Sequence, residues 1–246
     1  MEVNFWVTIS SSILSLLGCT FILTVYYMFP SLQIFAYLLV KDLTIFSLLH
    51  CLSDFLPSGI EATCQIQGFG LSSSAIQIMA WSCVISITLY MRIVKRKTIN
   101  EERFRRNSLI VVITLSVLMT ILPFTSSGFK ETPYGKDGPW CWITDDYEYG
   151  TWWKFAQFYI PCVICVLFNV FVTVCVVRVI KREYKNLIDP QQFPRKLIFR
   201  LWMYPLVIVV CLSPCAIFRI EQAISKTENG HAESCLLYTS PSPRDS

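Results

Sequence analysis

The sequence predicts an all-α membrane protein, a polytopic bundle of transmembrane helices. Hydrophobic residues make up 54% of the 246-residue chain and charged residues only 15%, and the apolar residues gather in long runs. Soluble domains carry about 25% charged residues, because their surfaces face water. A membrane-spanning helix needs about 20 mainly apolar residues. The charge deficit and the long runs therefore indicate a surface that faces lipid.

Six segments have the length and composition of a membrane span. They are Val3–Met28, Ile34–Leu56, Ile66–Val94, Ser108–Ser126, Thr151–Ile180 and Leu197–Ile220. The first begins almost at Met1, but it has no basic leader and no cleavage site, so we interpret it as a retained signal-anchor helix. Pro161 in the fifth span and Pro205 and Pro214 in the sixth predict kinks, because proline removes a backbone donor.

The basic residues predict the orientation of these spans. The loops after the third and fifth spans hold 14 of the 21 Lys and Arg residues. Both loops follow odd-numbered spans, and Lys and Arg concentrate on the cytoplasmic side, so the N-terminus is expected outside. The run from Thr98 to Glu101 fits a capping box, which predicts an inner helical extension leading into the fourth span.

Lys41 and Asp42 interrupt the second span, where a charge costs at least about 2.5 kcal/mol near the helix centre. Lys41 is long enough to reach the inner surface. Asp42 is shorter, so we expect it to face the bundle, either paired or protonated. A role for Asp42 as an intramembrane switch is the functional alternative.

Apart from Cys235, two cysteines are expected in outer segments, Cys64 at the start of the third span and Cys141 in the loop after the fourth. Disulfides persist on the oxidising side of a membrane, which favours a bridge over two free thiols. Trp140 and Trp142 flank Cys141, so a bridge would hold them over the mouth of the bundle. They are candidate ligand contacts; the alternative is an interfacial aromatic belt.

The sequence gives no sign of an enzyme. It contains no nucleophile elbow, zinc-protease motif, phosphate-binding loop or dinucleotide fingerprint, and its two histidines, His50 and His231, lack partners at motif spacing. No cysteine pair has a matching second pair, so we expect no metal site and no cofactor. The net charge of +4 reflects clustered loop residues, which argues against nucleic acid as a partner.

Three short runs resemble the cyclic-AMP receptor-like (class E) family of seven-transmembrane G-protein-coupled receptors. They are Cys64 to Phe69 with Trp81 and Leu89-Tyr90, then Trp140 to Ile143, then Tyr204 to Leu206 with the segment through Ile220. The resemblance implies a seven-helix fold, the Cys64–Cys141 bridge and signalling through a heterotrimeric G protein. It does not imply cyclic AMP as the ligand. The chain reads Leu89-Tyr90-Met91-Arg92 where rhodopsin-like receptors carry Asp-Arg-Tyr.

On this reading the chain is a cell-surface receptor, multi-pass in the plasma membrane, with an unknown extracellular ligand. The basic residues at the inner ends of the third and fifth spans are the expected G-protein contacts. They are Arg92, Lys95, Arg96, Arg178, Lys181 and Arg182. The alternatives are a transporter or channel subunit, and a membrane adaptor that does not signal. Transporters tend to show internal repeats, and broken helices with facing polar groups near the midplane of the membrane. The sequence shows neither feature, apart from the polar pair Lys41-Asp42.

The end of the chain departs from the resemblance. We assign residues 1–224 to a receptor domain that lacks its seventh span, and residues 225–246 to an outer-loop remnant and a tail. Residues 237–246 look like translated sequencing adaptor, so they are left out of fold reasoning.

Overall fold

The computed structural model describes residues 2–30, 34–57, 59–126, 132–137, 140–144 and 149–185. The chain divides into two units, Met1–Pro190 and Gln191–Ser246, and the described residues all belong to the first. Within this part, five helices are long and apolar enough to cross a membrane, so the predicted polytopic helix bundle is confirmed. The expected sixth span, Leu197–Ile220, lies outside the described residues.

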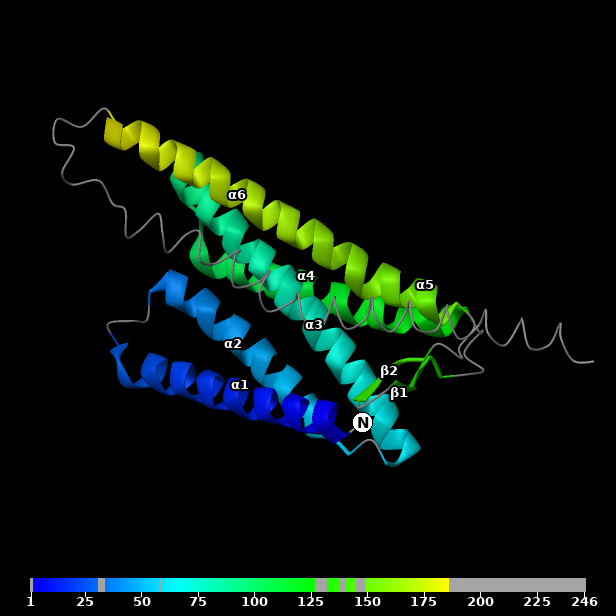
Figure 1. The fold of residues 1–246 in the computed structure, drawn as a ribbon. Helices are drawn as coiled ribbons and strands as arrows, with labels where there is room; N and C mark the ends of the chain where they lie inside the picture. Colours follow the sequence, from blue (N-terminus) through cyan, green and yellow to red (C-terminus); the bar gives the residue numbers. More distant parts are fainter. Residues whose placement is uncertain are drawn as a thin grey trace, which may run out of the picture. The chain divides into compact units, whose positions relative to one another are not determined.

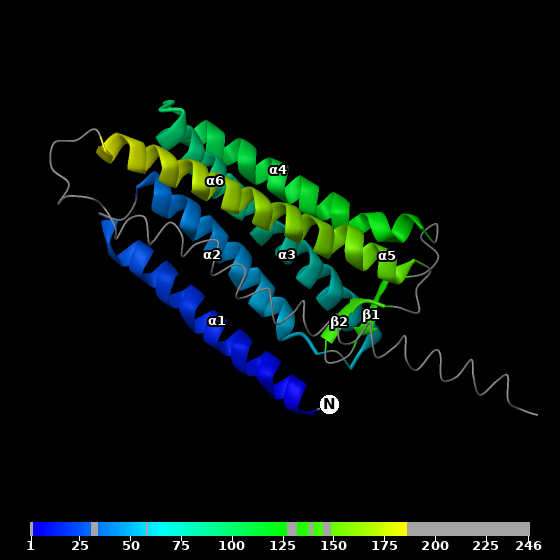
Figure 2. The same ribbon diagram turned by 45° about the horizontal axis from the view of Figure 1, so that its top comes forward.

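The described spans run in alternating directions (Figures 1 and 2). Their long α-helices are α1 Glu2–Met28, α2 Phe35–Asp54, α3 Glu61–Leu89, α4 Glu101–Ile121 and α6 Ile160–Lys185. Short segments extend three of them: the π-helical η2 Tyr90–Val94 after α3, the 3-10 helix η3 Leu122–Thr125 after α4, and α5 Gly150–Lys154 with the π-helical η4 Phe155–Tyr159 before α6. The fifth span is thus α5, η4 and α6 in sequence.

Two of the helices begin earlier than the apolar runs predict. α3 begins at Glu61, and polar side chains of its first turns find partners outside the helix: Thr63 donates to the Pro57 carbonyl, and Gln65 donates to Thr132. α4 begins at Glu101, and its N-cap is Asn100, whose side chain accepts a hydrogen bond from the Arg103 amide at 3.1 Å. The predicted inner extension is therefore present, but the capping box beginning at Thr98 is wrong. The short Asn100 side chain satisfies an amide of the first turn directly.

Pro161 accounts for the π-helical turn in the fifth span. Proline has no backbone N–H, and its ring clashes with the carbonyl four residues earlier, which is that of Gln157. The helix relieves this clash by widening over Phe155–Tyr159, immediately before the proline. Such widened turns are frequent at functional sites.

A β-hairpin follows α4, which the all-α prediction did not include. β1, Tyr134–Asp137, pairs antiparallel with β2, Trp140–Ile143, with Tyr134 opposite Ile143 and Asp137 opposite Trp140. Both strands contact α3, and β2 contacts α5 (Figure 1). Cys141 and Ile143 are fully buried, whereas Trp140 and Trp142 are half-buried, so the strand alternates between two faces.

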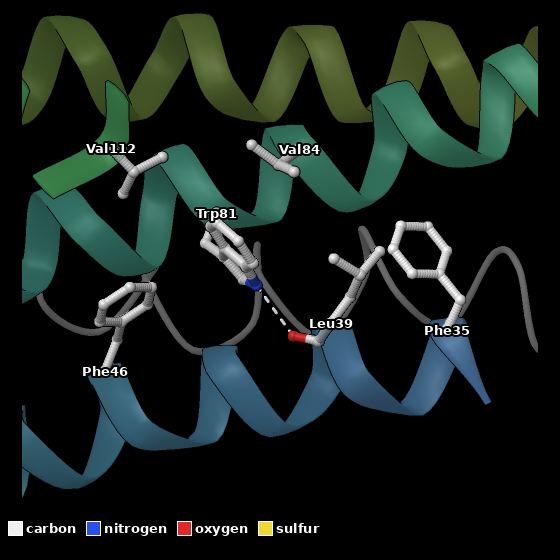
Figure 3. Close-up of a cluster of buried hydrophobic side chains, with 6 residues drawn as sticks. All are labelled: Phe35, Leu39, Phe46, Trp81, Val84 and Val112. Atoms are coloured by element: carbon white, nitrogen blue, oxygen red, sulfur yellow. Dashed lines mark hydrogen bonds between the residues drawn. The ribbon is translucent and has the colours of Figure 1, made fainter. Parts of the chain in front are cut away.

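α3 is the central helix, since it packs against α2, α4, α6 and both strands. Trp81 of α3 is completely buried and donates from Nε1 to the Leu39 carbonyl of α2 at 2.8 Å (Figure 3). Phe46 of α2 meets the Trp81 ring edge-on, with the ring centroids 5.7 Å apart. Val112 of α4 closes the same cluster, which fixes α2, α3 and α4 as one packed layer.

The two ends of the bundle differ in what they carry. The hairpin end, as we call it, holds β1, β2, the start of α3 and α5. The basic end holds η2, the start of α4 and the end of α6, where the exposed Lys and Arg residues gather. Each end is a candidate site.

Candidate functional site

A disulfide fastens the hairpin to the bundle. Cys64, in the first turn of α3, and Cys141, on β2, are bonded through their sulfur atoms, with Cα atoms 5.3 Å apart. The Cys141 amide also donates to Oε1 of Gln67, one turn further along α3, at 3.3 Å. Both cysteines are buried. The hairpin therefore rests on α3 through a covalent bond and a hydrogen bond, which holds the neighbouring tryptophans in place.

Trp142 reaches from β2 to both α3 and the fifth span. Its Nε1 donates to Oγ of Ser72 at 3.0 Å, and its ring meets Phe158 edge-on at 5.8 Å between centroids. The buried Lys154 places Nζ 5.7 Å from the centre of the same ring, which is the geometry of a cation–π contact. Trp140 lies on the same face of β2, half-buried and opposite Asp137. Trp142 thus joins the hairpin to the bundle interior.

Tyr134 of β1 anchors the other strand. Its hydroxyl donates to the Thr120 carbonyl at 2.9 Å and accepts from Nε2 of Gln157 at 3.2 Å. Gly68 of α3 allows this approach, because a Cβ there would lie only 3.0 Å from the Tyr134 ring. Burial raises the pKa of Tyr134 to about 12, and the hydrogen bond from Gln157 acts weakly in the opposite direction. The side chain therefore stays a neutral phenol.

Gln157 is the unsatisfied member of this group. It lies in the π-helical η4, is 3% exposed, and donates from Nε2 to the Met119 carbonyl at 2.7 Å. Its Oε1 has no hydrogen-bond partner among the described residues. A buried amide oxygen without a donor costs about 1–3 kcal/mol, so such groups mark places where a further donor belongs.

At the basic end, ion pairs join the loops to the helices. Arg92 of η2 pairs with Glu101 at the start of α4 and lies over the Phe35 ring, with Cζ 4.9 Å from its centre. Arg96 pairs with Glu183 of α6 through Nη2 and Oε1 at 2.6 Å. A cleft of about 700 Å³ opens beside these pairs, lined by Tyr90, Met91, Lys95, Arg96, Lys97 and Thr98. Of the expected G-protein contacts, Lys95 and Arg96 line this cleft, and all six are exposed at the basic end: Arg92, Lys95, Arg96, Arg178, Lys181 and Arg182.

Asp42 is paired inside the bundle. Its carboxylate is 2% exposed and accepts two hydrogen bonds from Arg105 of α4, at 2.6 Å from Nε and 2.8 Å from Nη2. Lys41 lies farther off, with Nζ 3.9 Å from the Asp42 oxygen and 5.5 Å from the centre of the Tyr26 ring. The two-pronged Arg105 contact ties α2 to α4 near the basic end, as planar guanidinium groups do with carboxylates.

Comparison with known proteins identifies the family. The family model described as 7 transmembrane receptor (rhodopsin family) matches residues 34–240. The chain belongs to this seven-transmembrane receptor family. It is also similar to "G-protein coupled receptor 1" of Arabidopsis thaliana, at 28% identity over 232 residues, which covers 90% of this chain and 68% of that protein. The chain is therefore a multi-pass membrane receptor of the G-protein-coupled class and is not an enzyme.

The sequence analysis did not predict several residues that take part in the sites at the hairpin end and the basic end of the bundle. Arg105 looked like one more loop cation, because nothing in the spacing links it to Asp42, 63 residues away. Tyr134 and the hairpin were missed, although Asp137-Gly138-Pro139 is a turn signal between the residues that form the two strands. Gln157 carries no signal beyond its place before Pro161.

Proposed function

We propose that this receptor lies in the plasma membrane with its N-terminus and hairpin end outside, and that a ligand bound at the hairpin end controls a heterotrimeric G protein bound at the basic end. The observation that carries this proposal is the family match over residues 34–240, together with the exposed basic cleft at the end opposite the disulfide-bound hairpin. Cytoplasmic loops carry the excess of Lys and Arg, and disulfides persist outside the cell, so both features favour the same orientation.

The ligand contacts proposed are Trp140 and Trp142, with Gln157 added by the structure. The two rings offer aromatic surface, and the buried Lys154 beside Trp142 is a positive charge 5.7 Å from that ring. Gln157 Oε1 needs a hydrogen-bond donor. These features favour a small ligand with an apolar body and at least one hydroxyl or amine.

The G-protein contacts proposed are exposed cations of the basic end, Arg92, Lys95, Arg96, Arg178, Lys181 and Arg182. Arg92 pairs with Glu101, and Arg96 pairs with Glu183. To contact a G protein, each arginine must either leave its glutamate or bind through the side of the guanidinium group that faces away from it. Exposed pairs cost only about 0–1 kcal/mol to break, which a partner can offset. The charged residues would speed association, and Tyr90 and Met91 of the cleft would supply apolar contact.

Three finer assignments also stand as proposals. The run Leu89-Tyr90-Met91-Arg92 favours the cyclic-AMP receptor-like branch of seven-transmembrane receptors. Residues 1–224 form the receptor domain. Asp42 is a candidate switch, because its pairing with Arg105 joins two helices and can be broken by a rearrangement at the basic end.

The test is nucleotide exchange on purified heterotrimeric G proteins by membranes that contain the full-length receptor. We expect exchange above the level of empty membranes, and a lower rate for the Lys95→Gln and Arg96→Gln double variant at equal expression. Lys136→Gln, an exposed lysine on β1, is the matched control and should leave exchange unchanged. No exchange with any G-protein class would contradict the proposed function, and exchange insensitive to the cleft variant would overturn the contact assignment.

Orientation is tested separately by labelling intact cells with an impermeant thiol reagent. A cysteine introduced in place of Lys136 is expected to react, and one in place of Lys97 is expected to react only after permeabilisation. The reverse pattern would contradict the outside N-terminus.

A further inference from the structure

Two free thiols meet where α3 packs against α6. Cys83 of α3 and Cys165 of α6 are 82 residues apart in sequence, and their Sγ atoms are 3.2 Å apart. Both are free cysteines. Cys165 is buried, and Cys83 is half-buried. A disulfide has a sulfur–sulfur length of about 2.05 Å, so the two atoms need to approach by about 1.2 Å to bond.

Polar groups surround the Cys165 sulfur on the α3 side. Ser82 Oγ lies 3.2 Å from it, and the Cys165 thiol donates to the Met79 carbonyl at 3.1 Å. Asn169, one turn along α6 and completely buried, directs Nδ2 at Cys165 Sγ from 3.4 Å and lies 3.9 Å from Cys83 Sγ. The Ser82 hydroxyl donates to the Met79 carbonyl at 2.7 Å, so the Asn169 amide is the donor left beside the sulfur atoms. The thiolate is the reactive form of cysteine.

The Asn169 side chain is held in this position by other bonds. Its Nδ2 donates to the Cys165 carbonyl at 2.7 Å and to Ser82 Oγ at 3.3 Å, and its Oδ1 accepts a hydrogen bond from Ser86. The two hydrogens of Nδ2 are shared between these oxygen atoms and the Cys165 sulfur, and the bonds to oxygen hold the amide beside both sulfur atoms. The Asn169 amide is thus held next to the sulfur atoms of Cys83 and Cys165. Apolar packing of two helices would not by itself place a polar side chain there.

We propose that Cys83 and Cys165 form a peroxide-sensitive dithiol site, at which a hydroperoxide oxidises the two thiols to a disulfide that joins α3 to α6. In the first step the Cys165 thiolate attacks one oxygen of the hydroperoxide. A sulfur–oxygen bond forms, the oxygen–oxygen bond breaks, and the departing hydroxide takes up the proton that Cys165 released and becomes water. Cys165 is now a sulfenic acid.

In the second step Cys83 attacks the Cys165 sulfur. The sulfur–sulfur bond forms, the sulfur–oxygen bond breaks, and the hydroxyl group leaves as water with the Cys83 proton. The two thiols lose two electrons, and hydrogen peroxide gains them as it becomes two molecules of water. Hydrogen peroxide is small and neutral, so it can reach a site within the bundle. The product fixes α3 against α6 until a thiol reductant reopens the bond.

A second pair of free cysteines provides an internal comparison. Cys19 of α1 and Cys51 of α2 are both free and buried. Their surroundings include no amide donor comparable to Asn169 among the described residues. We therefore expect Cys83 and Cys165 to be oxidised at a lower peroxide dose than Cys19 and Cys51. It depends neither on the ligand nor on the G protein.

The experiment uses the full-length receptor in membranes, exposed to graded hydrogen peroxide and then blocked with an alkylating reagent. Digestion without reduction and mass spectrometry then identify linked peptides. We expect a Cys83–Cys165 linked pair at the lowest effective dose, one-for-one loss of both free thiols, and full recovery of both after dithiothreitol. The Cys64–Cys141 linked peptide in the same digest reports that the protein is folded.

Two variants complete the test. Cys165→Ser should abolish the linked pair, and Cys162→Ser, the matched control one turn away on α6, should leave its dose dependence unchanged. The proposal is overturned if Cys83 and Cys165 remain open to alkylation at doses that consume Cys19 and Cys51. It is equally overturned if Cys83 or Cys165 is lost without a linked product.

Discussion

The buried pair of Asp42 and Arg105 predicts an unequal response to the removal of its two members. Arg105→Met deletes the cation and leaves a carboxylate that is 2% exposed. Breaking a buried pair in this way costs about 3–5 kcal/mol, because an uncompensated charge stays out of water. Lys41 Nζ, 3.9 Å from the same carboxylate, compensates part of the charge. We therefore expect the free energy of unfolding to fall by about 3 kcal/mol, the lower end of that range.

Asp42→Asn should be milder. It leaves Arg105 with a side chain that is 29% exposed and can turn toward water or headgroups. The loss is that of the charge-assisted hydrogen bonds, about 1.5–3 kcal/mol. In the double variant neither charge remains, so the combined loss should be smaller than the sum of the two single losses by at least about 1 kcal/mol.

The assay is the free energy of unfolding of the purified receptor in mixed micelles, titrated with a denaturing detergent for all members of the double-mutant cycle. Arg106→Met is the matched control, because Arg106 is exposed next to Arg105 on α4, and its loss should change stability by less than about 0.5 kcal/mol. Additive single effects, or an Asp42→Asn variant less stable than Arg105→Met, would refute the reasoning.

Three further predictions use the same measurement. Trp81→Phe should cost about 2–3 kcal/mol, because it removes the donor to Leu39 and leaves a void, whereas Trp152→Phe, at a position 63% exposed, should be neutral; equal effects would contradict the packing. The pKa of Tyr134 is about 12 when folded and about 10 unfolded, so stability should fall by about 3 kcal/mol as pH rises through that window, and a Tyr134→Phe variant that shows the same fall would exclude the phenol as its cause. Cys141→Ser opens a bridge of sequence separation 77 and should cost about 4 kcal/mol, less with membrane confinement, so a neutral variant would show that the bridge does not stabilise the fold.

The apolar runs were enough to predict the five described spans, because lipid selects for side chains independently of their partners. The run-based starts of α3 and α4 were late for a physical reason. The first turns of α3 hold polar side chains such as Gln65, which donates to Thr132, and the first turns of α4 hold charges such as Arg105, which pairs with Asp42. A hydropathy scale scores each side chain by itself and takes no account of its hydrogen-bond or ion-pair partner. It therefore assigns these polar side chains to loops.

The parts of the sites that sequence reasoning missed depend on contacts between distant residues. Asp42 was singled out because a charge in an apolar run is costly, but its partner is defined only by how α2 and α4 pack. The sulfur contact between Cys83 and Cys165 is of the same kind: each cysteine alone looks like a small apolar residue of a span. Trp142 was a candidate from its place beside Cys141, and its bond to Ser72 follows from the hairpin, which the all-α prediction lacked.

The polar burial of α3 has a consequence for how the receptor is made. Gln67, Ser73, Ser74, Gln77, Ser82 and Ser86 are all buried in the packed bundle. During synthesis α3 leaves the ribosome before α4 and α6, so these amides and hydroxyls meet the translocation channel or lipid before their partners exist. Amide and hydroxyl groups are poorly accommodated in hydrocarbon without hydrogen bonds. α3 should therefore remain in the channel, or beside a chaperone of the insertion machinery, until α6 arrives with Asn169.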